Sequence, residues 1–176
     1  MAMRKTRHAV FRPALRCGTL PLAALLWSAA ASSHALCTAD QRTLFACSTG
    51  SKRVAVCASP DLAAAAGSLQ YRFGRPGAVE LATPAQGSDW RATTRSGTLA
   101  FAGGGGAYLS FARPPYRYVV YTAIGSGWGQ RAGVVVEQGE RRIAHLRCRD
   151  KPTSLLGPDL WLQAGIQADA AGFELP

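Results

Sequence analysis

Four cysteines constrain what most of this chain can fold into. Cys37, Cys47 and Cys57 have nine residues in each gap, and Cys148 lies far along the chain. Metal sites usually combine close cysteine pairs with histidines, whereas residues 36–176 contain only His145. An even number of cysteines in an exported chain indicates disulfides, and we expect two. A zinc site is the competing interpretation; no other metal site and no cofactor is predicted.

The first 35 residues have the pattern of a signal peptide. A basic start without acids precedes an apolar run over residues 19–31, and small residues surround Ala35 at the expected cleavage position. The run is too short to span a bilayer, although a membrane anchor is the alternative. We therefore predict a periplasmic or secreted protein of residues 36–176, with no transmembrane span after processing.

Cleavage also changes the charge. It removes Cys17 and five of the 20 basic residues but none of the 10 acidic ones, which lowers the net charge from +10 to +5. A modest positive charge on an exported protein argues against nucleic acid as a partner. It favours an acidic protein or an anionic envelope polymer.

Residues 43–48 and 52–57 predict a β-hairpin that turns near Gly50 and places Phe45 opposite Val54. The cysteine beside the turn and the one at the far end are then ~15 Å apart at ~3.3 Å per residue. A disulfide needs Cα atoms within ~7 Å. This distance excludes a bond between the second and third cysteines. The preferred pairing is Cys37–Cys57 with Cys47–Cys148.

The remaining chain predicts short strands separated by turns. They cover residues 68–73, 78–82, 98–101, 107–111, 116–124, 132–137 and 141–149.

Two short helices are expected, one over residues 60–66 after the capping Ser59 and one over residues 158–164 before Gly165. Residues 83–95 are expected to form a loop, and the last residues a docked tail. About eight short strands predict a mainly β, single-domain antiparallel β-sandwich or small barrel, stapled by disulfides.

No residue pattern indicates catalysis. His145 lacks a local acid to orient it, and Arg142 and Arg147 disfavour its protonated form. Glycines 103–106 lack the lysine and hydroxyl of a phosphate-binding loop, so we interpret them as a hairpin turn. A glycosidase needs two acids in one cleft, and no pair stands out. The acids available are Glu80, Asp89, Glu137, Glu140 and Asp159.

Arginines interleaved with aromatic residues are the most suggestive binding pattern, because both residue types are enriched at binding hot spots. Trp128, which lies between glycines, is the best single candidate for contact with a partner. The alternative is that the aromatic strand residues form the core and the arginines face water. A second basic group, residues 141–151, is interpreted as a solvated face. The predicted contact residues are Trp128, Arg131, Arg72, Arg75 and Arg117.

Several segments resemble a family of small exported bacterial proteins that carry a Leu-Gln-Tyr-Arg-Phe-Gly segment, here residues 69–74. The resemblance covers nearly all of residues 36–176 and implies export and a single domain. Because no activity is assigned to that family, it implies no functional residue. Its other segments are residues 43–47, 52–57, 103–108, 118–121, 132–137, 157–159 and 172–176.

We therefore expect a non-catalytic binding or inhibitor-like module that acts on an envelope or extracellular partner. In size, disulfides and β content the chain is similar to periplasmic lysozyme inhibitors as a type, although it lacks a clear Ser-Gly-x-x-Tyr inhibitory loop. One alternative is a hydrolase of envelope polymers that uses an Asp/Glu pair. A further alternative is a structural envelope protein.

Overall fold

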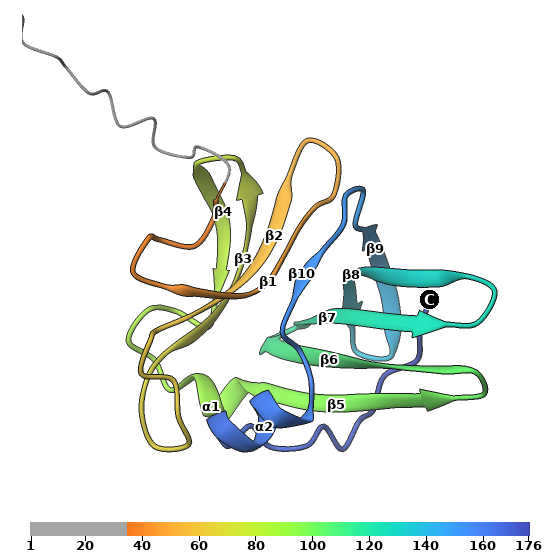
Figure 1. Cartoon of the computed structure of the whole chain (residues 1–176). Coiled ribbons are helices and arrows are strands. Elements are labelled where there is room, and N and C mark those ends of the chain that lie inside the picture. The colour runs from red at the N-terminus through yellow and green to blue at the C-terminus, as the bar shows by residue number, and fades with distance from the viewer. Residues whose placement is uncertain (1–34) are drawn as a thin grey trace, which may run out of the picture. The chain divides into compact units, whose positions relative to one another are not determined.

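The structure, a computed structural model, describes residues 35–176, which form two five-stranded antiparallel sheets (Figure 1). The predicted signal peptide lies outside the described residues except for Ala35. The first sheet has the strand order β10-β1-β2-β3-β4. Its strands are β1 (Arg42–Ser48), β2 (Arg53–Ala58), β3 (Leu69–Arg75), β4 (Ala78–Thr83) and β10 (Thr153–Ser154).

The second sheet is a meander in which each strand pairs with the next one along the chain. Neither sheet closes on itself or on the other, so the predicted mainly β sandwich is confirmed and the alternative of a closed barrel is wrong. The strands of the second sheet are β5 (Thr94–Phe101), β6 (Gly104–Arg113), β7 (Tyr116–Gly125), β8 (Gly129–Gln138) and β9 (Arg141–Arg147).

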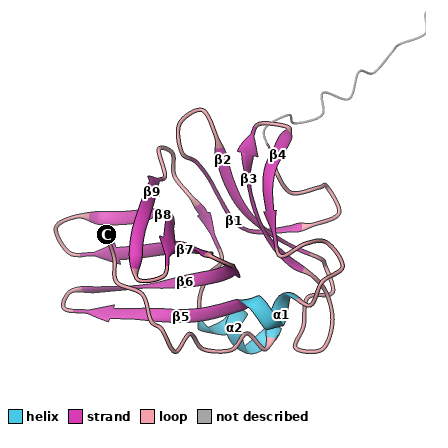
Figure 2. Cartoon of the chain, turned by 180° about the vertical axis from the view of Figure 1, so that it is seen from behind, coloured by secondary structure: helices cyan, strands magenta, loops and turns pink. Residues whose placement is uncertain are grey.

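The main core lies where the inner faces of the two sheets meet. Tyr71 of the first sheet packs against Phe111 and Tyr118 of the second, with ring centroids 5.9 and 5.3 Å apart. Two short helices, α1 (Trp90–Thr93) and α2 (Pro158–Ala164), lie together at one end of the second sheet (Figure 2). They add buried side chains, including Leu160, to the same core.

The outer face of the second sheet is also buried, because the C-terminal tail (residues 166–176) packs across it. Ser96 of β5 bonds to the backbone of residues 167 and 169, and Phe173 packs on Tyr108 and Tyr121. Val134 faces the main core while Val135 faces the tail. The strand β8 is therefore buried on both faces, and the docked tail covers its outer face.

Two disulfides join different parts of the fold. Cys37–Cys57, with Cα atoms 5.4 Å apart, holds the N-terminal segment on the outer face of the first sheet. Cys47–Cys148, with Cα atoms 5.6 Å apart, links β1 to the segment that follows β9 and so connects the two sheets. These are the two preferred pairs, and because they use all four cysteines of residues 35–176, none of these four is left for zinc.

The first hairpin differs in register from the prediction. Phe45 lies opposite Val56 rather than Val54, and a β-bulge follows Thr43. The reason is the turn, which lies one residue later than expected because the amide of Thr49 donates to the carbonyl of Lys52 and leaves Gly50 and Ser51 at the tip. Cys47 and Cys57 still face opposite sides of β1 and β2, so the disulfide argument survives the shift.

The helix predicted over residues 60–66 is wrong. Four alanines are too few to nucleate a helix by themselves, and the guanidinium of Arg91 binds the carbonyls of Ala63, Ala64 and Ala66. Ser59 accepts a hydrogen bond from the amide of Ser68 instead of capping a helix.

Other local predictions also need correction. The predicted loop 83–95 contains α1, with Asp89 as its cap. Glycines 104–106 belong to β6 rather than to the turn, and the short β10 raises the strand number to ten. The glycines fit the strand because a Cβ at Gly106 would come within 2.4 Å of the Thr122 carbonyl.

Candidate functional site

The two predicted contact residues on β3, Arg72 and Arg75, lie apart from the others. Arg72 is half-buried and donates to the Gln70 side chain and the Leu36 carbonyl, each at 2.7 Å. Burial lowers the pKa of Arg72. Arg75 is exposed and lies 3.8 Å from a Glu80 oxygen. Arg72 therefore serves to hold the N-terminal segment, and Arg75 forms a surface ion pair with Glu80.

Arg117, on the outer face of β7, is enclosed by acidic partners. Its guanidinium forms ion pairs with Glu137 of β8 and Asp169 of the tail, and it donates to the Gly172 carbonyl at 2.8 Å. Burial lowers the pKa of Arg117, but the two carboxylates outweigh that effect, so the pKa is raised. We refer to Arg117, Glu137 and Asp169 as the closed cluster; it ties the tail to the sheet.

Trp128 and Arg131, the remaining predicted contact residues, lie together at the turn between β7 and β8. The Arg131 guanidinium lies over the indole, 4.5 Å from the ring centroid. The indole packs on Gly125, where a Cβ would come within 2.3 Å of the ring, and its centroid is 5.7 Å from that of Phe101. Trp128 is half-buried and Arg131 is exposed, so the indole supports the arginine.

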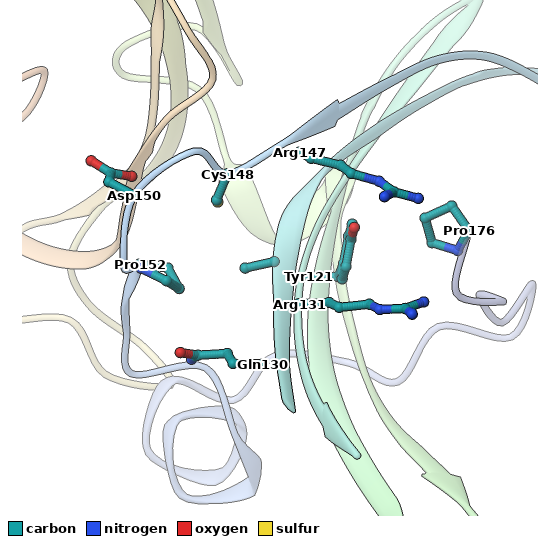
Figure 3. Close-up of a pocket in the computed structure, with 9 residues that line it drawn as sticks. Tyr121, Gln130, Arg131, Arg147, Cys148, Asp150, Pro152 and Pro176 are labelled. Atoms are coloured by element: carbon teal, nitrogen blue, oxygen red, sulfur yellow. The ribbon is translucent and has the colours of Figure 1, made fainter. Parts of the chain in front are cut away.

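Arg131 lines a pocket of about 180 Å³ together with Tyr121 of β7 and Arg147 of β9 (Figure 3). Strand register brings these three residues together, because Gly133 lies opposite both Tyr121 and Arg147, and Arg131 is two residues before it. Figure 3 shows the three side chains near one another, with Pro176 of the tail beside them. We call this the basic pocket. The other residues that line it are Gln130, Ala132, Cys148, Asp150 and Pro152.

The charge of the basic pocket is not neutralised. Among residues 35–176, neither Arg131 nor Arg147 forms an ion pair. Asp150, on the other side of the pocket, accepts a hydrogen bond from the Ser48 amide at 2.8 Å and lies 3.8 Å from Arg53. Its carboxylate is therefore directed toward the first sheet, and the two guanidinium groups are available to a ligand.

A tyrosine–histidine pair lies beside these arginines. The Tyr121 hydroxyl is 2.8 Å from Nε2 of His145. Burial raises the pKa of Tyr121, and the positive charges of Arg147, Arg131 and Arg142 offset part of that rise. Burial lowers the pKa of His145, and Arg147 and Arg142 lower it further. The predicted effect of these arginines on His145 is confirmed, and His145 is neutral at pH 7.

The acids considered for a hydrolase have structural roles. Glu80 pairs with Lys52, and Asp89 accepts from the Arg91 amide at 3.0 Å as the cap of α1. Glu137 and Asp169 come together only because both bind Arg117. Glu140 is exposed, and Asp159 lies in the first turn of α2.

The described residues contain neither a group of metal-ligating side chains nor a membrane-spanning helix. In the part of the chain that the structure describes, no group of three or more His, Cys, Asp or Glu residues could hold a metal ion. Within residues 35–176 no helix is long and apolar enough to cross a membrane.

The basic pocket was only half predicted. The sequence predicts Arg131 as a contact residue and groups Tyr121 with the interleaved arginines and aromatic residues, whereas it places Arg147 on a solvated face. The strand parity that places His145 and Arg147 on one face was available in the sequence, but their pairing with Tyr121 depends on the register of three strands. Comparison with protein-family models, curated proteins and solved structures gives no match to this chain.

Proposed function

We propose that this protein is a non-catalytic binding module that contacts an anionic partner through the basic pocket and the adjoining Trp128. The observation that supports this is the presence of two guanidinium groups, Arg131 and Arg147, in one pocket without an acidic partner among the described residues. Arginine and tryptophan are the residues most enriched at binding hot spots. Guanidinium groups also bind carboxylate and phosphate through paired hydrogen bonds.

The partner is expected in the envelope or the extracellular space. Two disulfides favour an oxidising compartment, and the signal-peptide pattern and the family resemblance agree with export. An inhibitor-like module is one form of this function, in which the partner is an enzyme with an acidic surface.

A capture experiment with charge-matched variants tests the proposal. The protein is exported from a bacterial host so that its disulfides form, immobilised, and exposed to envelope extract and a panel of lysozymes at low and high salt. We expect a salt-sensitive partner that the double variant Arg131→Ala/Arg147→Ala fails to retain. The control is Arg113→Ala/Arg141→Ala, which removes the same charge from exposed positions of the second sheet.

Two results would contradict the proposal. Equal loss of capture in both double variants would show that only net charge matters, and undiminished capture by Arg131→Ala/Arg147→Ala would place the contact surface elsewhere. Trp128→Ala tests the adjoining indole. It should weaken capture less than the double arginine change, because Trp128 is half-buried and supports Arg131.

A further inference from the structure

We propose that the basic pocket binds a phosphate group, with Arg131 and Arg147 on either side and the Tyr121 hydroxyl as a third donor. This inference rests on the proposed function and specifies the chemistry of its ligand. The donors come from three neighbouring strands, β7, β8 and β9, which a hydrogen-bonded ladder holds at fixed spacing. Such a framework keeps three donors directed at one space.

The number of donors favours phosphate over carboxylate. A guanidinium presents five N–H groups in a planar fork, and one fork is enough to bind both oxygens of a carboxylate. Two lone-pair sites of the carboxylate would then remain for a second fork and a phenol, which together present three donors. A phosphate monoester has three free oxygens in a tetrahedral arrangement and a charge of about −1.5 to −2 at pH 7, so it matches two guanidinium groups in both geometry and charge.

A hydrogen bond with His145 leaves the hydroxyl proton of Tyr121 free to bind the phosphate. Its Nε2 lies 2.8 Å from the Tyr121 oxygen, and the imidazole is neutral at pH 7 because burial and two arginines lower its pKa. A neutral imidazole that carries its proton on Nε2 donates to the phenol oxygen, which leaves the phenol O–H free to donate to a ligand. Tyr121 is itself almost fully buried, at 2% exposure, so the position of its hydroxyl oxygen is fixed.

The two acidic residues nearest this pocket in the chain, Asp150 and Glu174, form no ion pair with these arginines. The Asp150 carboxylate is engaged by the Ser48 amide and lies near Arg53, and the Glu174 side chain is exposed while its carbonyl accepts from Arg142 at 2.9 Å. Trp128 lies under Arg131 and leaves the edge of that guanidinium for hydrogen bonds.

The test measures small anions on the full protein. Calorimetric or NMR titrations use inorganic phosphate, glycerol phosphate and, as the planar comparison, acetate at matched ionic strength. We expect saturable phosphate binding at least about tenfold tighter than acetate binding, because one charge-assisted hydrogen bond corresponds to roughly a tenfold change.

The variants separate the three donors. Arg147→Ala should weaken phosphate binding about tenfold or more, and Tyr121→Phe about fivefold, since it deletes one neutral hydrogen bond. Arg147→Lys keeps the charge and the packing but loses the fork, so an intermediate affinity supports the geometry even if Arg147→Ala fails to fold. Arg113→Ala/Arg141→Ala should bind phosphate like the unaltered protein.

Two further experiments test whether the phosphate belongs to a lipid or to a soluble ester. Sedimentation with phosphatidylcholine vesicles, with and without phosphatidic acid, tests a lipid headgroup, while glycerol phosphate tests a soluble ester. Binding in either arm supports the proposal, provided that Arg147→Ala abolishes it. Acetate binding as tight as phosphate binding, or phosphate binding unaffected by Arg147→Ala and Tyr121→Phe, overturns it. If phosphate does not bind but capture from envelope extract still depends on Arg131 and Arg147, this inference fails and the proposed function stands.

Discussion

The outer face of the second sheet carries two arginine sites that differ in whether acidic residues pair with the arginines. In the closed cluster, Arg117 is bound by Glu137, Asp169 and the Gly172 carbonyl. In the basic pocket, Arg131 and Arg147 have no acidic partner among residues 35–176. Both sites use residues of β7 and β8 and have arginine at their centre. The difference between them is what the C-terminal tail brings to each.

The tail crosses the sheet from β5 toward β9 (Figure 1), and of its two acidic residues, Asp169 and Glu174, only Asp169 forms an ion pair with the sheet. Near its start Asp169 compensates Arg117, and further along Phe173 packs on aromatic rings. At its end it contributes Pro176 to the wall of the basic pocket. An arginine therefore becomes structural where the tail provides a carboxylate and stays available for a ligand where it does not.

The largest predicted effect concerns the disulfide that borders the basic pocket. Replacing Cys47 and Cys148 with serine should lower the free energy of unfolding by about 4–5 kcal/mol, given the 101-residue separation. It should also weaken phosphate binding, because Cys148 lines the pocket. Urea denaturation and phosphate titration measure the two effects.

The other disulfide is the matched control. Replacing Cys37 and Cys57 should cost about 3 kcal/mol, since the separation is 20 residues. It should leave phosphate affinity unchanged, because neither residue lines the basic pocket. A common loss of phosphate affinity in both variants would mean that general loosening of the sandwich, rather than the pocket wall, controls binding.

The next prediction separates the two arginine sites directly. Arg117→Met should lower the free energy of unfolding by about 2–3 kcal/mol, because it leaves two poorly solvated carboxylates without a partner. The side chains of Glu137 and Asp169 are only 16% and 6% exposed. Arg131→Met should change stability by about 0.5 kcal/mol or less, as expected for an exposed position. Urea denaturation of the two variants is the measurement; equal losses would remove the distinction between the sites.

This distinction marks the limit of what the sequence could predict. Strand alternation, a local property of the sequence, predicts the β-sandwich. Cysteine spacing, together with one distance argument, limits the possible disulfide pairs. Both Arg117 and Arg131 are predicted contact residues, Arg117 between two tyrosines of a strand and Arg131 after a glycine-rich turn that carries Trp128. What separates them in the structure is the acids that bind Arg117, namely Glu137, 20 residues later, and Asp169, 52 residues later. No periodicity within β7 reports a contact made by the tail.

The same reasoning explains the errors in the fold. The alanines after Ser59 favour a helix by propensity. However, the guanidinium of Arg91, far along the chain, donates hydrogen bonds to their carbonyl groups. Glycines 104–106 suggest a turn by composition, yet they form part of β6 because neighbouring backbone and side chains come too close for a Cβ. In both cases a tertiary contact outweighs a local preference.

A smaller effect is expected from loosening the tail between the two sites. Phe173 is half-buried, with ring centroids 5.2 Å from Tyr108 and 5.6 Å from Tyr121. Phe173→Ala should lower the free energy of unfolding by about 2 kcal/mol, less than for a fully buried phenylalanine. Hydrogen exchange should rise at the amides of Ser96 and Asp169, which bond tail to sheet.

Leu162→Ala is the control for this change, because Leu162 is 81% exposed on α2 and should change neither quantity. If Phe173→Ala is as neutral as Leu162→Ala, the closed cluster alone holds the tail, and the aromatic contacts add nothing measurable.

The smallest expected effect is the titration of His145. Facing the imidazole are Tyr121 from β7, Arg131 from β8, and Arg142 and Arg147 from β9, while the tail contributes Phe173 over Tyr121. Burial and the arginines lower the pKa of His145 below its ordinary value of about 6.5. The folded protein thus favours the neutral ring. The resulting stability is present above pH ~6.5 and is lost as the pH falls through the lowered pKa of the folded state.

Two changes should move this titration in the same direction. Arg147→Gln removes a positive charge and should raise the pKa of His145, although burial, the larger cause, keeps it below the ordinary value. Saturation with phosphate should also raise it, because the bound anion neutralises the arginines. NMR titration of the ring, assigned with His145→Gln, measures both shifts. Arg117→Met, a change in the closed cluster, should leave the pKa of His145 unchanged. A phosphate shift that persists in Arg147→Ala/Arg131→Ala would place the anion elsewhere and end the proposed difference between the two sites.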